Sequence, residues 1–148
     1  MKFKSEDADQ FLQSKDYIDT AIIPLVGMNM NQIKQTVSLG EFTMLVAEEL
    51  ERQLKGRVFL FPTYTYLEVN EVKEADILEV KKSVHQHFQN VVFVTSDSNW
   101  RQYDEINESL FLLKPVPLEH LKVELKQKVL QDSVEQILNF LLQKWNPS

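Results

Sequence analysis

Four short runs of apolar residues are the clearest pattern along the chain. They lie at residues 20–26, 58–61, 91–95 and 110–113, and the second run, 58–61, contains no polar residue at all. A strand with one face in water would alternate apolar and polar residues, so these runs predict strands that are buried on both faces. Segments with helical spacing separate the first three runs and follow the last. This alternation predicts a layered α/β fold, with a mostly parallel sheet of about four strands flanked by helices.

The segments around the runs predict four helices, beginning near residues 5, 38, 73 and 118. The second helix has the clearest ends, because Ser38 and Glu41 form a capping box and Gly56 stands where a left-handed C-cap residue belongs. Residues 27–37 are then a long loop. The final helix is expected to reach Trp145, with a break near Asp132.

Prolines complicate the first two strands. Pro24 cannot donate a hydrogen bond to a neighbouring strand, which predicts an edge position, a bulge or an end of the strand at Ile23. After Pro62, residues 63–67 either extend the second strand or form a loop. The polar segment 96–109 has room for a short helix.

Length and composition fit a single domain spanning residues 1–148. The chain has 16 Lys and Arg against 22 Asp and Glu, a net charge of −6, and the two signs are interleaved, so we expect no nucleic-acid partner. It has no cysteine, which excludes disulfides and thiolate chemistry and fits a cytoplasmic protein. No run approaches the ~18 apolar residues of a membrane span, so we expect no membrane insertion.

The segments that follow the predicted strands are where a ligand would bind, because ligands of open α/β sheets collect beyond the carboxyl ends of the strands. Four residues there are candidate ligand-binding residues: Tyr64, Asp97, Trp100 and Lys114. Asp97 has an alternative role as a turn cap between Ser96 and Ser98.

No pattern for catalysis, a cofactor or a metal ion is present in the sequence. A phosphate-binding loop needs several small residues, whereas the first run is followed by a lone Gly27 and then Met28. His85 and His87 lie two positions apart on a predicted helix, so they point to different faces and do not grip one metal ion. We therefore expect no catalytic residue, no cofactor and no metal site.

The last predicted helix carries an apolar arc wider than one core contact requires. Leu138, Phe140, Leu142 and Trp145 contribute to it. Such a helix is either covered by its own domain or used against a partner, and the second alternative makes these four residues a candidate interaction surface for another protein or a second copy of the chain.

Residues 17–25 (YIDTAIIPL), 41–42 (EF) and 48–60 (EELERQLKGRVFL) resemble the YpiF-like family of uncharacterised proteins from Gram-positive bacteria. The resemblance spans most of the chain. It implies an identity but no catalytic residue.

A second resemblance concerns residues 109–115 (SLFLLKP) and 118–121 (LEHL), which look like the last strand, Lys-Pro turn and final helix of response-regulator receivers. It implies a flavodoxin-like or receiver-like outline. Receivers also need an acidic pair after the first strand and a phosphate-accepting aspartate after a later one, whereas this chain has Leu25-Val26 and Phe61-Pro62 at the strand ends compared. Phosphotransfer is therefore not expected.

These observations favour a non-catalytic cytoplasmic domain that acts through protein contacts, as an accessory or assembly factor. A domain that binds a small ligand or acts as an enzyme, with its pocket at the carboxyl ends of the strands, is the alternative. A degenerate receiver-like module is another, and it requires the strand order 2-1-3-4 with Lys114 facing a pocket.

Overall fold

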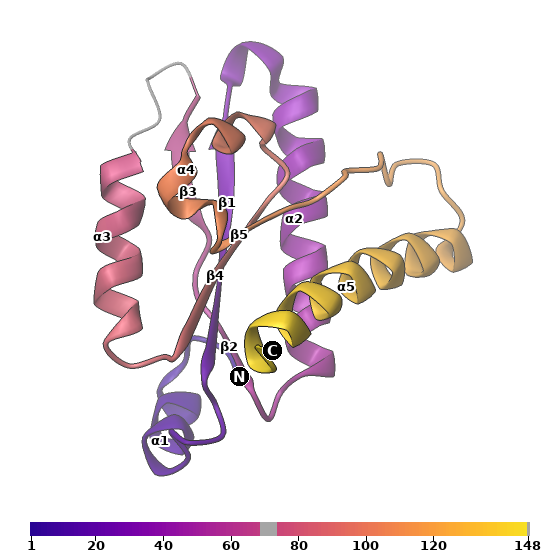
Figure 1. Ribbon diagram of the computed structural model, residues 1–148. Coiled ribbons are helices and arrows are strands. Elements are labelled where there is room, and N and C mark those ends of the chain that lie inside the picture. Colours follow the sequence, from indigo (N-terminus) through magenta and orange to yellow (C-terminus); the bar gives the residue numbers. More distant parts are fainter. Residues whose placement is uncertain (69–73, 148) are drawn as a thin grey trace.

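A parallel sheet of five strands lies between helices packed on both of its faces (Figure 1). The computed structural model describes residues 1–68 and 74–147. The α/β fold class predicted from the alternating runs is confirmed. The strands are β1 (Thr20–Met28), β2 (Val58–Leu60), β3 (Tyr64–Leu67), β4 (Asn90–Thr95) and β5 (Leu110–Leu112).

Strand β1 organises the sheet, because it pairs with three other strands. Along one edge it pairs with β4 from Thr20 to Leu25. Along its other edge it pairs first with β2, from Thr20 to Ile22, and then with β3, from Leu25 to Met28. With β2 and β3 counted as one interrupted strand, the order β2-β1-β4-β5 is 2-1-3-4, the beginning of a common doubly wound order.

Pro24 does not interrupt β1, which continues to Met28. On one side β2 ends opposite Ile22 and β3 begins opposite Leu25, so the gap between these two strands lies beside Pro24. A proline is tolerated in a sheet where its missing N–H faces no acceptor. Residues 64–67 therefore do continue the second strand, after a break that contains Pro62.

Helices of more than one turn cover both faces, and two 3₁₀ turns and a short helix follow strand ends. They are α1 (Ser5–Gln13), η1 (Met30–Gln32), α2 (Ile33–Gln53), α3 (Glu74–His85), η2 (Ser98–Gln102), α4 (Asp104–Asn107) and α5 (Val123–Trp145). In the described part of the chain, none of them is both long and apolar enough to cross a membrane.

The predicted ends of α2 are wrong. The helix begins at Ile33, directly after η1, because the Thr36 hydroxyl accepts from the Asn29 N–H at 2.8 Å and donates to the Asn29 carbonyl at 3.1 Å. These bonds tie the end of β1 to the first turn of the helix, so Ser38 lies inside it. At the other end Leu54 is the cap residue, and no described glycine has a positive φ, so Gly56 is not a left-handed cap.

The predicted ends of the final helix also need correction. Helix α5 begins at Val123 instead of residue 118, because His120 has a φ of 70° that an α-helix does not accommodate. No break occurs near Asp132, whose carboxylate pairs with Lys128 one turn earlier at 3.3 Å.

Apolar side chains fill both faces of the sheet. On one face α2 and α5 bury Phe42, Val46 and Leu141 against Ile22 and Val92. On the other face, the side chains that line the sheet come from α3, η2, α4 and α1. Figure 1 shows α2 and α5 on one side of the sheet, α3 on the other, and the start of α5 projecting beyond the sheet.

The arc of α5 is largely covered by its own domain. Phe140 packs edge-on against Phe111, with ring centroids 5.5 Å apart. The Trp145 indole N–H donates to the Thr20 hydroxyl at 2.8 Å. Leu138 is half-buried and Leu142 is 42% exposed. Of the four residues in the candidate interaction surface, Leu142 is therefore the most open to a partner.

Neighbouring leucines on α5 allow a matched test of this packing. Leu141 is fully buried, whereas Leu142 is exposed. We expect Leu141→Ala to lower the free energy of unfolding by about 2–5 kcal/mol, because it leaves a cavity in the core. Leu142→Ala should change it by less than about 0.5 kcal/mol. Urea denaturation followed by circular dichroism measures both, and equal losses would contradict this packing of α5.

Candidate functional site

The carboxyl ends of β1, β4 and β5 meet at one edge of the sheet, and a cavity of about 560 Å³ opens there. It lies beside the topological switch point, where the connections on the two sides of β1 pass over opposite faces of the sheet. We call it the switch-point cavity. Its walls consist of Asn29, Gln32, Gln35, Thr36, Leu39, Glu68, Ser96, Asp97, Ser98, Asn99, Arg101, Leu112, Leu113, Lys114 and Pro115.

Hydroxyl groups fix the end of β4, which forms the floor of the cavity. The Thr95 hydroxyl donates to the Leu25 carbonyl at 2.9 Å and accepts from the Asp97 N–H at 3.1 Å. The Thr43 hydroxyl donates to the Leu39 carbonyl, so at its 2.7 Å contact with Ser96 it is the acceptor. All of these groups belong to β1, α2 or the end of β4, and their hydrogen bonds join these elements beneath Ser96 and Asp97.

Asp97 follows β4 and has both of its carboxylate oxygens engaged. Oδ1 accepts the Asn99 N–H at 3.0 Å, which caps η2, and Oδ2 accepts the Tyr66 hydroxyl at 2.5 Å. Asp97 therefore acts as the turn cap that was one of its two expected roles. It also lines the switch-point cavity, so its other expected role, in ligand binding, stays a prediction.

Tyr66 links Asp97 to the core on the α3 side of the sheet. Its hydroxyl accepts the indole N–H of Trp100 at 2.7 Å while it donates to Asp97, and the Tyr66 and Trp100 rings meet edge to face with centroids 5.4 Å apart. Burial, reinforced by the hydrogen bond to Asp97, raises the pKa of the Tyr66 hydroxyl. Tyr66 therefore stays neutral and keeps its proton in this bond.

Glu68 supplies a second carboxyl group at the cavity wall, and Gly27 gives it space. A β-carbon at Gly27 would lie 2.7 Å from Glu68 Oε1 and 3.0 Å from the Tyr66 ring, so only glycine allows this approach. Burial raises the pKa of the Glu68 carboxyl, and the nearby charge of Asp97 adds to the effect.

Two cations, Arg101 and Lys114, line the same cavity, and they follow the carboxyl ends of the neighbouring strands β4 and β5. Lys114 follows Leu113, whose N–H donates to the Thr95 carbonyl at 2.7 Å and so extends the pairing of β5 with β4. Both cationic side chains are exposed, and within residues 1–68 and 74–147 neither has an ion pair or a side-chain hydrogen bond. Their charges are available to a ligand.

The four predicted ligand-binding residues divide into three groups. Asp97 and Lys114 both line the switch-point cavity. Trp100 is 1% exposed and reaches the cavity only through Tyr66 and Asp97. Tyr64 packs half-buried against the apolar cluster on the α3 side and does not line the cavity.

Sequence reasoning missed Tyr66, which supports the cavity through its bond to Asp97, and several residues of the cavity wall itself. Tyr66 lies on the same strand face as Tyr64, so period-two spacing could not choose between them. The sequence predicts a loop at Gln35 and Thr36, because the capping box predicts a later start for α2, at Ser38. Arg101 lies in the segment after β4, where the sequence predicts that a ligand would bind, but no motif distinguishes it from its neighbours.

Metal binding has no obvious place here. Among the described residues, no three His, Asp or Glu side chains gather as they would around a metal ion. The chemistry available at the cavity is therefore hydrogen bonding by amides and hydroxyls, together with two carboxyl groups and two cations.

This fold and cavity define a doubly wound α/β domain with a polar crevice at its switch point. Residues 9–145 match the family model described as "Protein of unknown function (DUF2487)", and the chain belongs to this family. It is 45% identical over 147 residues to "Uncharacterized protein YpiF" of Bacillus subtilis (strain 168), covering 99% of both chains. No solved structure matches it. The resemblance to the YpiF-like family is thus confirmed.

The link from Trp100 through Tyr66 to Asp97 can be tested with a matched tyrosine pair. Tyr66→Phe leaves the buried indole N–H without its acceptor, so we expect the free energy of unfolding to fall by about 1–3 kcal/mol. Tyr64→Phe removes a hydroxyl that has no hydrogen bond within residues 1–68 and 74–147, and should cost less than about 0.5 kcal/mol. Urea denaturation measures both; equal effects would contradict the link.

The raised pKa of Glu68 predicts that Glu68→Gln increases the stability of the fold in a pH-dependent way. The folded state binds this proton more tightly than the unfolded state, so Glu68 lowers stability once pH rises through its folded pKa. We expect Glu68→Gln to raise the melting temperature at about pH 7, and the difference to vanish below about pH 4. Exposed Glu79→Gln is the control. A higher melting temperature of Glu68→Gln that persists below about pH 4 would contradict the raised pKa of Glu68.

Proposed function

We propose that the protein binds a small anionic molecule, one that carries a carboxylate or another oxyanion, in the switch-point cavity. The observation that carries this proposal is the convergence of Asp97, Arg101 and Lys114 on one cavity beside the junction of β1 and β4. Ligands of doubly wound sheets bind in the crevice at this position. The volume of about 560 Å³ falls within the ~300–1,000 Å³ typical of small-molecule sites.

The two exposed cations in the cavity wall favour an anion. Asp97 directs both of its oxygens to neutral donors of the protein itself, Tyr66 and Asn99, and burial raises the pKa of the Glu68 carboxyl. Arg101 and Lys114 are cations that have no ion pair and no side-chain hydrogen bond among the described residues. The planar fork of arginine matches carboxylate and phosphate groups, and lysine adds a mobile point charge.

Binding without a chemical step fits the state of Asp97 best. A general base must be free to accept a proton from the substrate. Asp97 is the carboxylate nearest the end of β4, and each of its oxygens already accepts a hydrogen bond from the protein, one from Tyr66 and one from Asn99. These contacts support a role in shaping the site, which agrees with the expectation of a non-catalytic domain.

Action through protein contacts is the second candidate function. It is favoured by an apolar stripe on the outer side of α2 and η1, where Met30, Ile33, Val37 and Met44 are 61%, 56%, 58% and 43% exposed. Their helical spacing places them along one side. An accessory or assembly factor could present this stripe to a partner protein or to a second copy.

The receiver-like alternative is supported in outline by the strand order and by the place of Lys114 in the cavity wall. It lacks the acidic pair that receivers carry after the first strand, since β1 ends in Gly27 and Met28 and is followed by Asn29. We therefore place it behind the two candidates above.

Titration with acetate and inorganic phosphate tests the anion site. We expect saturable shifts of the backbone amide signals of residues 96–99 and 114 in a ¹H–¹⁵N NMR spectrum. A charge-assisted hydrogen bond contributes about 1.5–3 kcal/mol, so Arg101→Gln and Lys114→Gln should each weaken binding about tenfold or more.

Lys82→Gln is the matched control, because Lys82 is exposed on α3 and lies outside the cavity. It should leave the affinity unchanged. Saturation that neither cavity variant weakens, or no saturable shift with either anion, would contradict the proposed site.

A further inference from the structure

We infer that the ligand is amphipathic, with its anionic head in the switch-point cavity and an apolar tail in a groove beside it. This inference rests on the proposed function and names the class of molecule that the site takes. The groove has a volume of about 770 Å³ and lies between the start of α2 and the loop that precedes α5. Neither the anion site nor the fold alone requires this groove.

Apolar side chains and prolines form much of the groove wall. Ile33 and Leu39 contribute from α2, and Pro115, Val116 and Pro117 contribute from the opposite loop. Ile33 is 56% exposed and Val116 is 38% exposed, so a tail in the groove would remove apolar surface from water. That removal is favourable in proportion to the area covered.

The groove is continuous with the switch-point cavity. Gln32, Gln35, Leu39 and Pro115 line both hollows, so one molecule can extend from one to the other along α2. The two differ in chemistry along this path. The cavity end has hydroxyl groups and two cations without a partner among the described residues, whereas the groove end adds Ile33, Val116 and Pro117 to its polar residues.

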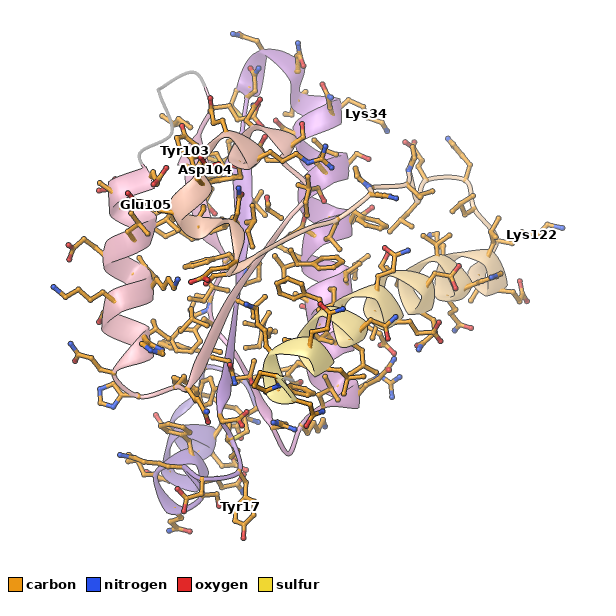
Figure 2. The ribbon with its side chains drawn as sticks, viewed as in Figure 1. Tyr17, Lys34, Tyr103, Asp104, Glu105 and Lys122 are labelled. Carbon is orange, nitrogen blue, oxygen red and sulfur yellow. The ribbon has the colours of Figure 1, made fainter. Side chains whose placement is uncertain are left out.

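Charge does not oppose an apolar tail in the groove. Its two charged residues are Lys34 and Glu119, which form an ion pair that joins α2 to the opposite loop. Figure 2 shows Lys34 near the start of α2 and pointing away from the sheet. An apolar tail in the groove therefore lies beside charges that are already paired with each other. The anionic head lies in the cavity, beside Arg101 and Lys114.

The dimensions favour a free small amphiphile over a bilayer lipid. Each hollow lies within the range of small-molecule sites, about 300–1,000 Å³. Binding to an anionic bilayer is driven by clusters of basic residues, whereas this chain has a net charge of −6. The inference therefore commits to a soluble carboxylate or similar oxyanion with a short apolar chain or ring.

A homologous series of carboxylates tests the inference by NMR titration. The probes are acetate, butanoate, hexanoate and octanoate. We expect the affinity to rise about fourfold for each methylene that enters the groove, and the signals of Ile33 and Val116 to shift only with the longer members. Acetate should shift the cavity signals alone.

Val116→Asn tests where the tail binds, because it puts a polar group in the groove wall on an exposed loop. We expect it to flatten the dependence on chain length and to leave the affinity for acetate unchanged. Val37→Asn is the control, since Val37 is 58% exposed on α2 and does not line the groove. It should preserve the full dependence.

The outcomes separate this inference from the proposed function. Saturable binding of acetate with no gain along the series overturns the apolar tail and leaves the anion site standing. No saturable binding of any member overturns both. A gain that Val116→Asn does not reduce overturns the groove as its location. Sedimentation with phosphatidylglycerol vesicles should leave the protein in the supernatant, and co-sedimentation would overturn the choice of a free ligand.

Discussion

Hydrogen bonding along both edges of β1 is the constraint on which the rest of the structure depends. One strand of nine residues supports β4 on one side and, in succession, β2 and β3 on the other. Because a parallel strand must satisfy its backbone groups with neighbours distant in sequence, each pairing also fixes the helix that connects it. The position of every cavity residue follows from this, since the ends of β1, β3, β4 and β5 are held at one edge.

The fold was largely predictable from the sequence, and the ends of its helices were not. Runs such as Val91 to Val94 have no polar side, so burial on both faces was readable without a structure. Ser38 and Glu41 had the spacing of a capping box, yet the bonds between Thr36 and Asn29 start α2 earlier. Local patterns show where a helix can begin, and tertiary contacts select among the options.

The candidate site was predictable in location but not in composition. Asp97 and Lys114 could be chosen because each follows a buried run, and both line the cavity. Tyr66 could not be distinguished from Tyr64, since the choice depends on the register of β3 against β1. The groove beside the cavity depends on where the loop before α5 crosses α2, a relation between segments far apart that no local pattern encodes.

The bond from Trp145 to Thr20 joins residues separated by 125 positions, and it has a consequence for how the chain folds. Strand β1 is made early during synthesis, but its partner β4 and the covering helix α5 come much later. Until α5 emerges from the ribosome, Ile22 and Val92 on that face of the sheet lack part of their cover. Non-local parallel pairing of this kind is intrinsically slow to form, so apolar surface on this face stays exposed until the pairing is complete.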